Sequence, residues 1–289
     1  GSTGTNHAIN ITGGSENIGI FTNVAMTSAA DITVNADKST GMFAKNAGTS
    51  TSTGKISATG ASVKALIADN STITSSGKVD VTGTASSDTD GSVGLAAMNG
   101  GTITHTGGGD ITVDGSASIG ALGQSGGTVD ITGGTIKATG GAFNTYAQGG
   151  TVKLNGTTIN TEQKSLAFYA DNTGGTGKIN FTGATTANIA GGTDANTRGT
   201  AFYYKGSGYS PFTASDIGTW ASNTFGGTIN NLTLNMASGS RLFIASDVSM
   251  NLSDTAGSGL TSSLGANIVG NDYKTFMLYL SCLLYTSPS

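Results

Sequence analysis

The chain has 289 residues, a formal net charge of −4 and a charged fraction of 10%. Its 13 basic residues are scattered over the whole length, so the basic patch that a nucleic-acid-binding protein needs is missing, and we exclude a nucleic-acid partner. Glycine occurs 47 times while Ile, Val and Thr recur throughout, and low charge combined with β-branched residues argues against a disordered chain. The composition favours one large repetitive domain.

A short phrase of a mostly small residue, two mostly apolar residues and another mostly small residue recurs along the chain. It occupies residues 19–22, 41–44, 65–68, 94–97, 120–123, 144–147, 167–170 and 201–204. Successive copies are about 22 to 34 residues apart, so the pattern indicates a repeat with loops of variable length.

A second phrase alternates apolar and polar residues, and a third, shorter one appears in several units. The second covers residues 32–34, 56–58, 79–81, 111–113, 136–138 and 179–181, and the third covers 102–104, 129–131 and 152–154. Strict alternation is typical of a strand with one buried face. We predict that Ile56, Val79, Val81, Ile111, Val113 and Ile179 are buried, and that Ser57, Asp80, Thr112 and Asn180 are exposed.

Three strands in a unit of about 24 residues predict an all-β fold, a right-handed parallel β-helix with three short strands per coil. A leucine-rich repeat would need a regular Leu framework and a helix-compatible stretch, which the Gly and β-branched residues interrupt. A propeller would need blades of about 40 residues. The pattern therefore favours a solenoid in which each coil pairs with its neighbours.

The chain divides into four segments on this reading. Residues 1–206 are repetitive coils, and residues 207–226 form an irregular loop insertion in which Trp220 and Phe212 cover apolar surface beside Pro211. Residues 227–281 are a C-terminal β-helix section. Residues 282–289 match the translation of a common transposon-end sequencing adapter, so we interpret them as an artefact.

The two ends of the sequence bear on whether the chain has disulfides and on whether it is part of a longer protein. Removing residues 282–289 takes away Cys282, the single cysteine, so we expect neither a disulfide nor a thiolate metal site. Gly1 begins inside a patterned region without an apolar leader. We therefore expect both ends to be cuts through a longer protein.

The segments GMFAKN (41–46), ALIADN (65–70) and NGGTIT (99–104) resemble the passenger domains of type V autotransporter adhesins of diderm bacteria. Residues 232–279, with GSRLF (239–243) and YKTFM (273–277), are similar to the late passenger that precedes the translocator barrel. The resemblance implies export through the outer membrane, folding at the cell surface, and linkage in the full protein to an outer-membrane translocator barrel. It also implies a stalk or adhesin whose partner is a host or bacterial surface protein or a glycan.

Residue types that could bind metal are sparse. His7 and His105, the two histidines, lie about four units apart, so they form no dyad, and we expect both to be ordinary surface or turn residues. The stretches at 107–110 and 191–194 begin like calcium-binding glycine-rich nonapeptides but do not continue as such, which favours turns. We predict neither metal nor cofactor.

The alternative function is a β-helical polysaccharide-degrading enzyme, a lyase or an inverting hydrolase. Asp80 and Asp110 come from equivalent strands and would lie roughly 8 Å apart, inside the window for an inverting carboxylate pair. Lys78 aligns beside Asp110, however, and neither an Arg nor an aromatic residue is near to hold a sugar. This pattern favours a solvated charge ladder, and we predict that the chain is not an enzyme.

Parity within the first phrase predicts a binding stripe. Inward positions would be Ile18, Ile20, Met42, Leu66, Val93, Leu95, Ile119, Leu166, Phe168 and Phe202. The intervening residues would face outward as one apolar ladder: Phe21, Phe43, Ile67, Ala96, Leu122, Tyr146, Tyr169 and Tyr203. Contiguous exposed apolar patches mark interaction sites, whereas the alternative is that these rings stack inside the helix or lie under the 207–226 loop.

Overall fold

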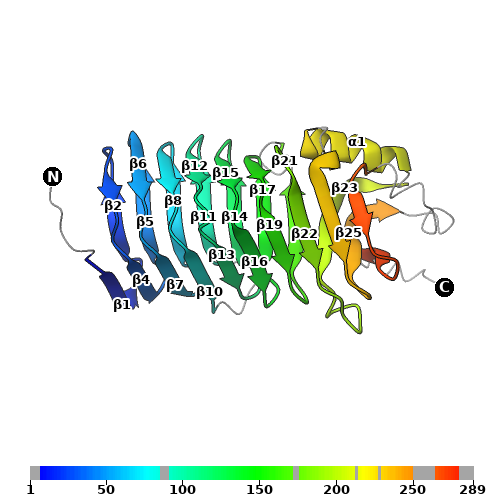
Figure 1. Cartoon of the computed structure of the whole chain (residues 1–289), viewed down its shortest axis with the longest axis horizontal. Helices are drawn as coiled ribbons and strands as arrows, with labels where there is room; N and C mark the ends of the chain where they lie inside the picture. The colour runs from blue at the N-terminus through cyan, green and yellow to red at the C-terminus, as the bar shows by residue number, and fades with distance from the viewer. Residues whose placement is uncertain are drawn as a thin grey trace, which may run out of the picture.

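The computed structural model describes residues 7–84, 91–171, 176–211, 214–226, 229–249 and 264–279. The strands stack one beside the next along the long axis of the molecule, from the N-terminal end to the C-terminal end (Figure 1). Three parallel sheets form a β-solenoid of about 7 turns with a period of ~25 residues and three strands per turn. The predicted parallel β-helix is therefore confirmed.

Each of the first seven coils contributes one strand to each of three sheets, here named A, B and C, and the later described coils contribute strands to sheets A and B. Within the described residues, sheet A consists of β1 (Ile9–Ser15), β4 (Ile32–Asp37), β7 (Ile56–Gly60), β10 (Val79–Gly83), β13 (Ile111–Asp114), β16 (Thr135–Thr139), β19 (Thr158–Thr161), β22 (Thr185–Ile189), β24 (Leu232–Met236) and β26 (Asn267–Val269). Sheet B consists of β2 (Ile18–Thr22), β5 (Thr40–Lys45), β8 (Lys64–Asp69), β11 (Val93–Met98), β14 (Ile119–Gln124), β17 (Phe143–Gln148), β20 (Leu166–Asp171), β23 (Thr200–Pro211), β25 (Arg241–Ser249) and β27 (Lys274–Tyr279). Sheet C consists of β3 (Thr27–Ser28), β6 (Thr49–Ser52), β9 (Thr72–Ser75), β12 (Thr102–His105), β15 (Thr128–Thr132), β18 (Thr151–Asn155) and β21 (Lys178–Phe181).

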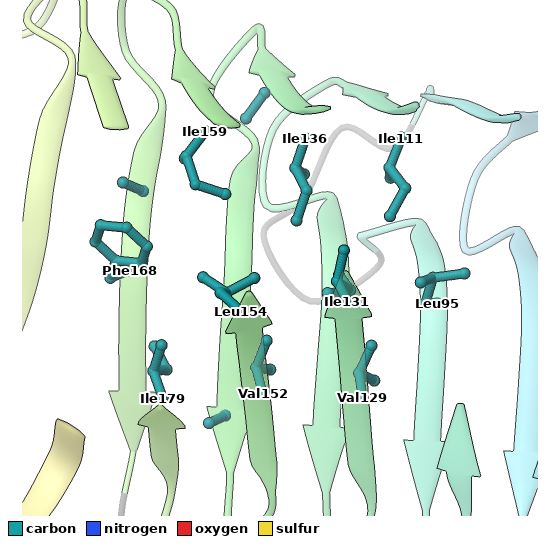
Figure 2. Packing of buried hydrophobic residues seen from close by; sticks show 14 of the residues in the cluster. Leu95, Ile111, Val129, Ile131, Ile136, Val152, Leu154, Ile159, Phe168 and Ile179 are labelled. Atoms are coloured by element: carbon teal, nitrogen blue, oxygen red, sulfur yellow. The ribbon is translucent and has the colours of Figure 1, made fainter. Parts of the chain in front are cut away.

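The core is a set of ladders in which like residues stack from coil to coil. Ile111 pairs in register with Val79 on one side and Ile136 on the other. Figure 2 shows the Ile111 and Ile136 side chains pointing into the solenoid. The apolar residues of the alternating phrases that were predicted to be buried are buried: Ile56, Val79, Val81, Ile111, Val113 and Ile179. The polar residues between them are partly exposed on the opposite face: Ser57, Asp80, Thr112 and Asn180. The predicted strand register is confirmed.

The prediction from parity was wrong for the first residue of four sheet B strands, β2, β11, β14 and β20. Ala65 and Leu66, which are consecutive, both lie in the core. Two successive inward residues break the alternation, so the residue before them faces outward. The side chains predicted to be inside but found outside the core cluster are Ile18, Val93, Ile119 and Leu166.

The break is accompanied by steric crowding at the second position of the strand, where the chain turns from sheet A into sheet B. A Cβ on Gly94 would lie 2.6 Å from the carbonyl oxygen of Gly120 in the next coil, and 3.4 Å from the Ile111 side chain. Little space therefore separates the backbones at this corner. The position carries mostly Gly or Ala in successive coils, at residues 19, 41, 65, 94, 120, 144, 167 and 201.

The predicted irregular loop over residues 207–226 contains a helix instead. Strand β23 runs on to Pro211, and α1 (Ala214–Phe225) follows, then the 3-10 turn η1 (Ile229–Asn231). Helix α1 buries Ile217, Ala221 and Phe225, which are four residues apart and so lie on one face. The prediction that Phe212 covers apolar surface lies outside the described residues.

Helix α1 occupies the place in its coil where earlier coils have a sheet C strand (Figure 1). Phe225 stacks on Phe181 of β21 with ring centroids 5.5 Å apart, and Trp220 meets Phe202 and Phe243 edge-on at 5.8 and 5.7 Å. Trp220 therefore covers apolar surface, as predicted. The helix also covers β21, the last described strand of sheet C. A bare strand edge is a template for unwanted pairing, and the helix prevents such pairing at β21.

The outer face of sheet A carries an amide ladder near its C-terminal end. The Asn188 Nδ2 donates a hydrogen bond to Asn160 Oδ1, and Asn235 Nδ2 donates to Asn188 Oδ1, both at 2.8 Å. A groove of about 540 Å³ follows these three residues. The ladder ties successive coils together outside the core.

Candidate functional site

The predicted apolar ladder lies on the outer face of sheet B, with one residue on each of eight successive strands. We call it the sheet B stripe: Phe21, Phe43, Ile67, Ala96, Leu122, Tyr146, Tyr169 and Tyr203, in continuous register. Its middle residues belong to an apolar cluster separate from the core, together with Val93 and Ile119. The alternative that these side chains stack inside the helix is therefore wrong.

Exposure varies along the sheet B stripe. Phe21 is 55% exposed at the N-terminal end, whereas Ile67 and Leu122 are each 7% exposed because neighbouring outward side chains cover them. Tyr146 and Tyr169 are partly exposed. The stripe is thus a packed apolar ridge whose aromatic ends are the parts that solvent reaches.

The three tyrosines form a stack. Tyr146 and Tyr169 are parallel, with ring centroids 4.5 Å apart and an interplanar angle of 2°. Tyr203 lies 4.5 Å from Tyr169 on the other side, tilted by 51°, and Phe143 meets Tyr146 and Tyr169 edge-on. Both faces of Tyr169 are covered, so the stack presents ring edges to solvent and leaves no open face of Tyr169.

Asp171 supplies the hydroxyl partner that sequence reasoning missed. The Tyr146 and Tyr169 hydroxyls both donate to Asp171 Oδ2, at 3.3 and 3.4 Å, while the Tyr203 hydroxyl donates to Ser246 Oγ at 3.0 Å. Burial raises the pKa of Tyr146 and of Tyr169 well above the ordinary value, and the Asp171 charge adds to the rise. The sequence could have indicated this contact, because Asp171 follows Tyr169 by two residues and so lies on the same face of the strand.

A groove of about 770 Å³ runs beside the tyrosine stack. Its floor includes Phe143, Leu166 and Ile244, and its wall is made by the turns from sheet A into sheet B. Two of those turn residues, Gly140 and Gly141, have φ values of 67° and 92° and carry no side chain that could fill the groove. Lys164 adds a cationic group at the wall.

The carboxylates considered for catalysis are held in other interactions. Asp80 forms ion pairs with Lys55 and Lys78, each at 3.1 Å, and Asp110 accepts a hydrogen bond from the Thr135 backbone N–H at 3.0 Å. Partial burial alone would raise the pKa of Asp80, but the hydrogen bonds and charges of the two lysines outweigh it and lower the pKa below its ordinary value. A carboxylate whose pKa is lowered in this way is a poor general acid. Asp80 instead forms a ladder of alternating charge with Lys55 and Lys78, as the sequence favoured.

The expectation that both histidines are surface or turn residues is correct for His7 and wrong for His105. His7 is exposed, but His105 is only 1% exposed and lies inside sheet C, in register with Ser75 and Ile131. Its Nε2 donates to the Gly109 carbonyl oxygen at 2.8 Å, so its Nδ1 accepts from the Ser75 hydroxyl at 2.6 Å. Burial lowers the pKa of His105 and keeps the ring neutral.

The glycine-rich stretches are turns, as predicted. Gly107 and Gly108 have φ values of 78° and 75°, which are accessible to glycine at little cost, and the Asp194 carboxylate accepts a hydrogen bond from the Asn196 N–H at 2.8 Å. In the part of the chain that the structure describes, His, Cys, Asp and Glu residues nowhere gather in groups of three or more that could hold a metal ion.

The function of the chain is inferred from its fold and from the sheet B stripe, because the comparisons with known proteins find no match. None of the described helices is both long and apolar enough to cross a membrane. No protein-family model, curated protein or solved structure matches the chain.

Proposed function

We propose that this chain is part of the stalk of a surface-displayed adhesin of the autotransporter passenger type, which binds a protein partner through the outer face of sheet B. The observation that carries the proposal is the sheet B stripe, an apolar surface outside the core that ends in a tyrosine stack and a groove. Contiguous apolar patches on the outside of a protein are typical of interaction sites.

The geometry of the stack favours a protein over a glycan as the partner. Aromatic residues hold sugars through their open ring faces, and both faces of Tyr169 are covered by Tyr146 and Tyr203. Ring edges, hydroxyl groups and an apolar groove floor are the features by which tyrosine-rich protein interfaces bind. Localisation at the cell surface, after export through the outer membrane, belongs to the same proposal.

The test is attachment of the purified chain, displayed on beads, to cells and to extracellular protein matrix. Replacing Tyr146→Ser together with Tyr169→Ser should weaken binding by about tenfold or more, because a few central aromatic residues dominate most interfaces. The matched control is Thr102→Ser with Thr104→Ser, which changes two partly exposed residues on the outer face of sheet C. Circular dichroism should show the same strand content in both variants.

Two results would contradict the proposal. Equal attachment of the tyrosine variant and the threonine variant would remove the sheet B stripe from the binding function. Cleavage of a polysaccharide panel by the chain, lost on Asp80→Asn, would instead identify the β-helical enzyme that we set against the adhesin.

A further inference from the structure

The tyrosine stack has a geometry suited to chemistry between rings as well as to binding. Tyr146 and Tyr169 come from adjacent coils, are parallel within 2°, and point their hydroxyl groups at one carboxylate oxygen of Asp171. Their hydroxyl ends therefore lie on the same side of the stack, which brings the ring carbons next to the two hydroxyls near one another. Asp171 is 7% exposed, so bulk water competes little for this contact.

Loss of an electron from a neutral phenol requires loss of its proton as well. The raised pKa of both tyrosines keeps the two phenols protonated at neutral pH. Asp171 Oδ2 already accepts a hydrogen bond from each hydroxyl, which makes it the nearest base for that proton.

We propose that Tyr146 and Tyr169 are a site of oxidative modification, where a one-electron oxidant, such as a haem peroxidase acting on hydrogen peroxide, joins two adjacent coils through a carbon–carbon bond. This inference does not rest on the proposed function. It assigns to the stack a covalent stitch between coils.

Each phenol gives one electron to the oxidant and its hydroxyl proton to Asp171, which passes it to solvent. The two resulting radicals form a bond between the ring carbons next to the oxygens. Each of those carbons then loses its hydrogen as a proton, and each oxygen regains one. Two tyrosines and one hydrogen peroxide give one dityrosine and two water molecules.

Tyr203 provides an internal control of matched distance. It lies 4.5 Å from Tyr169, as Tyr146 does, but it is tilted by 51° and its hydroxyl donates to Ser246 rather than to Asp171. The geometry therefore predicts coupling between Tyr146 and Tyr169, and not between Tyr169 and Tyr203.

The experiment oxidises the whole chain at low micromolar concentration with horseradish peroxidase and hydrogen peroxide, followed by trypsin and mass spectrometry. Cleavage after Lys137, Lys153, Lys164 and Lys178 places Tyr146 and Tyr169 in different peptides, residues 138–153 and 165–178. The expected product is these two peptides joined with the loss of two hydrogen atoms. It should disappear with Tyr146→Phe, persist with Tyr203→Phe, and form more slowly with Asp171→Asn.

Mixing isotopically labelled and unlabelled chains separates coupling within a molecule from coupling between molecules. Hybrid labelled–unlabelled pairs would overturn the proposal, as would a Tyr169–Tyr203 product or a yield unchanged by Tyr146→Phe. Circular dichroism of the Phe variants checks that each retains the fold.

Discussion

His105 shows how one residue can make the stability of a solenoid depend on pH. The ring stacks between Ser75 and Ile131 in the interior of sheet C, and its two hydrogen bonds leave no place for a second ring proton without a rearrangement. The pKa of His105 is lowered in the folded state by burial, against an ordinary value of about 6.5. The unfolded chain therefore binds this proton at a higher pH than the folded chain does.

Stability should consequently fall as the pH is lowered through about 6.5 toward the folded-state value. Below the unfolded pKa, the contribution of His105 to the free energy of unfolding should decrease by at most about 1.4 kcal/mol per pH unit. Denaturant titrations at several pH values would measure this. The double variant Ser75→Ala with His105→Leu should remove the slope, whereas His7→Gln, at an exposed histidine, should retain it. A slope unchanged in the double variant would assign it to other groups.

The buried location of His105 was open to prediction from parity. It ends the strand after Ile103, and two residues along a strand face the same side, so the position is an inward one. The residue type gave little guidance, because histidine is intermediate in its tendency to be buried. The tyrosine positions were predicted correctly, but the Asp171 contact was missed because the prediction considered apolar neighbours only.

At the scale of elements, strands were predicted where alternation is regular, and errors arose where the chain leaves that pattern. The corner before each sheet B strand places two successive residues inward, which a strict period of two cannot anticipate. Helix α1 was missed because Gly218, Thr219 and Ser222 are weak helix formers that obscure the four-residue spacing of its buried face. Tertiary packing against β21 outweighs this low propensity.

Helix α1 should be necessary for the stability of the C-terminal coils. Phe225 is 1% exposed and contacts Phe181, Phe202 and Trp220, so Phe225→Ala should lower the free energy of unfolding by about 3–5 kcal/mol. The control Thr219→Ala changes an exposed residue of the same helix and should have little effect. Denaturation followed by circular dichroism measures both.

Loss of the helix should also uncover the edge of β21. Light scattering of the Phe225→Ala variant should therefore show association that the Thr219→Ala variant lacks. A stable, monomeric Phe225→Ala variant would contradict a covering role for α1.

At the scale of the whole molecule, each coil is a unit that pairs only with its neighbours. Register places Phe143 over Ile119, Thr151 over Thr128 and Ile159 over Ile136. Deleting residues 119–142 removes one strand from each sheet and joins Ser118 to Phe143, which then pairs with Val93. In the interior ladders of sheets C and A, Ile103 then lies over Val152 and Ile111 over Ile159, so the shortened solenoid should fold.

Comparing this deletion with one of half a coil tests the modular architecture. Removal of residues 119–130 deletes β14 and most of β15, so the sheet A strand β16 would follow Ser118 after residues 131–134, where strands of sheets B and C belong. This deletion should abolish cooperative unfolding and the strand signal in circular dichroism. The whole-coil deletion should keep both. Equal damage from the two deletions would show that the coils do not act as interchangeable units.

The amide ladder and the interior ladders share a property that bears on how such a chain acquires its structure. Partner residues in neighbouring coils are close in sequence; the hydrogen bond between Asn160 and Asn188 of the amide ladder, for example, spans 28 residues. The entropic cost of closing each loop is therefore similar and modest along most of the rod, and every completed coil offers its edge as a template for the next. A chain built in this way can acquire order progressively from one end while the remainder is still being delivered.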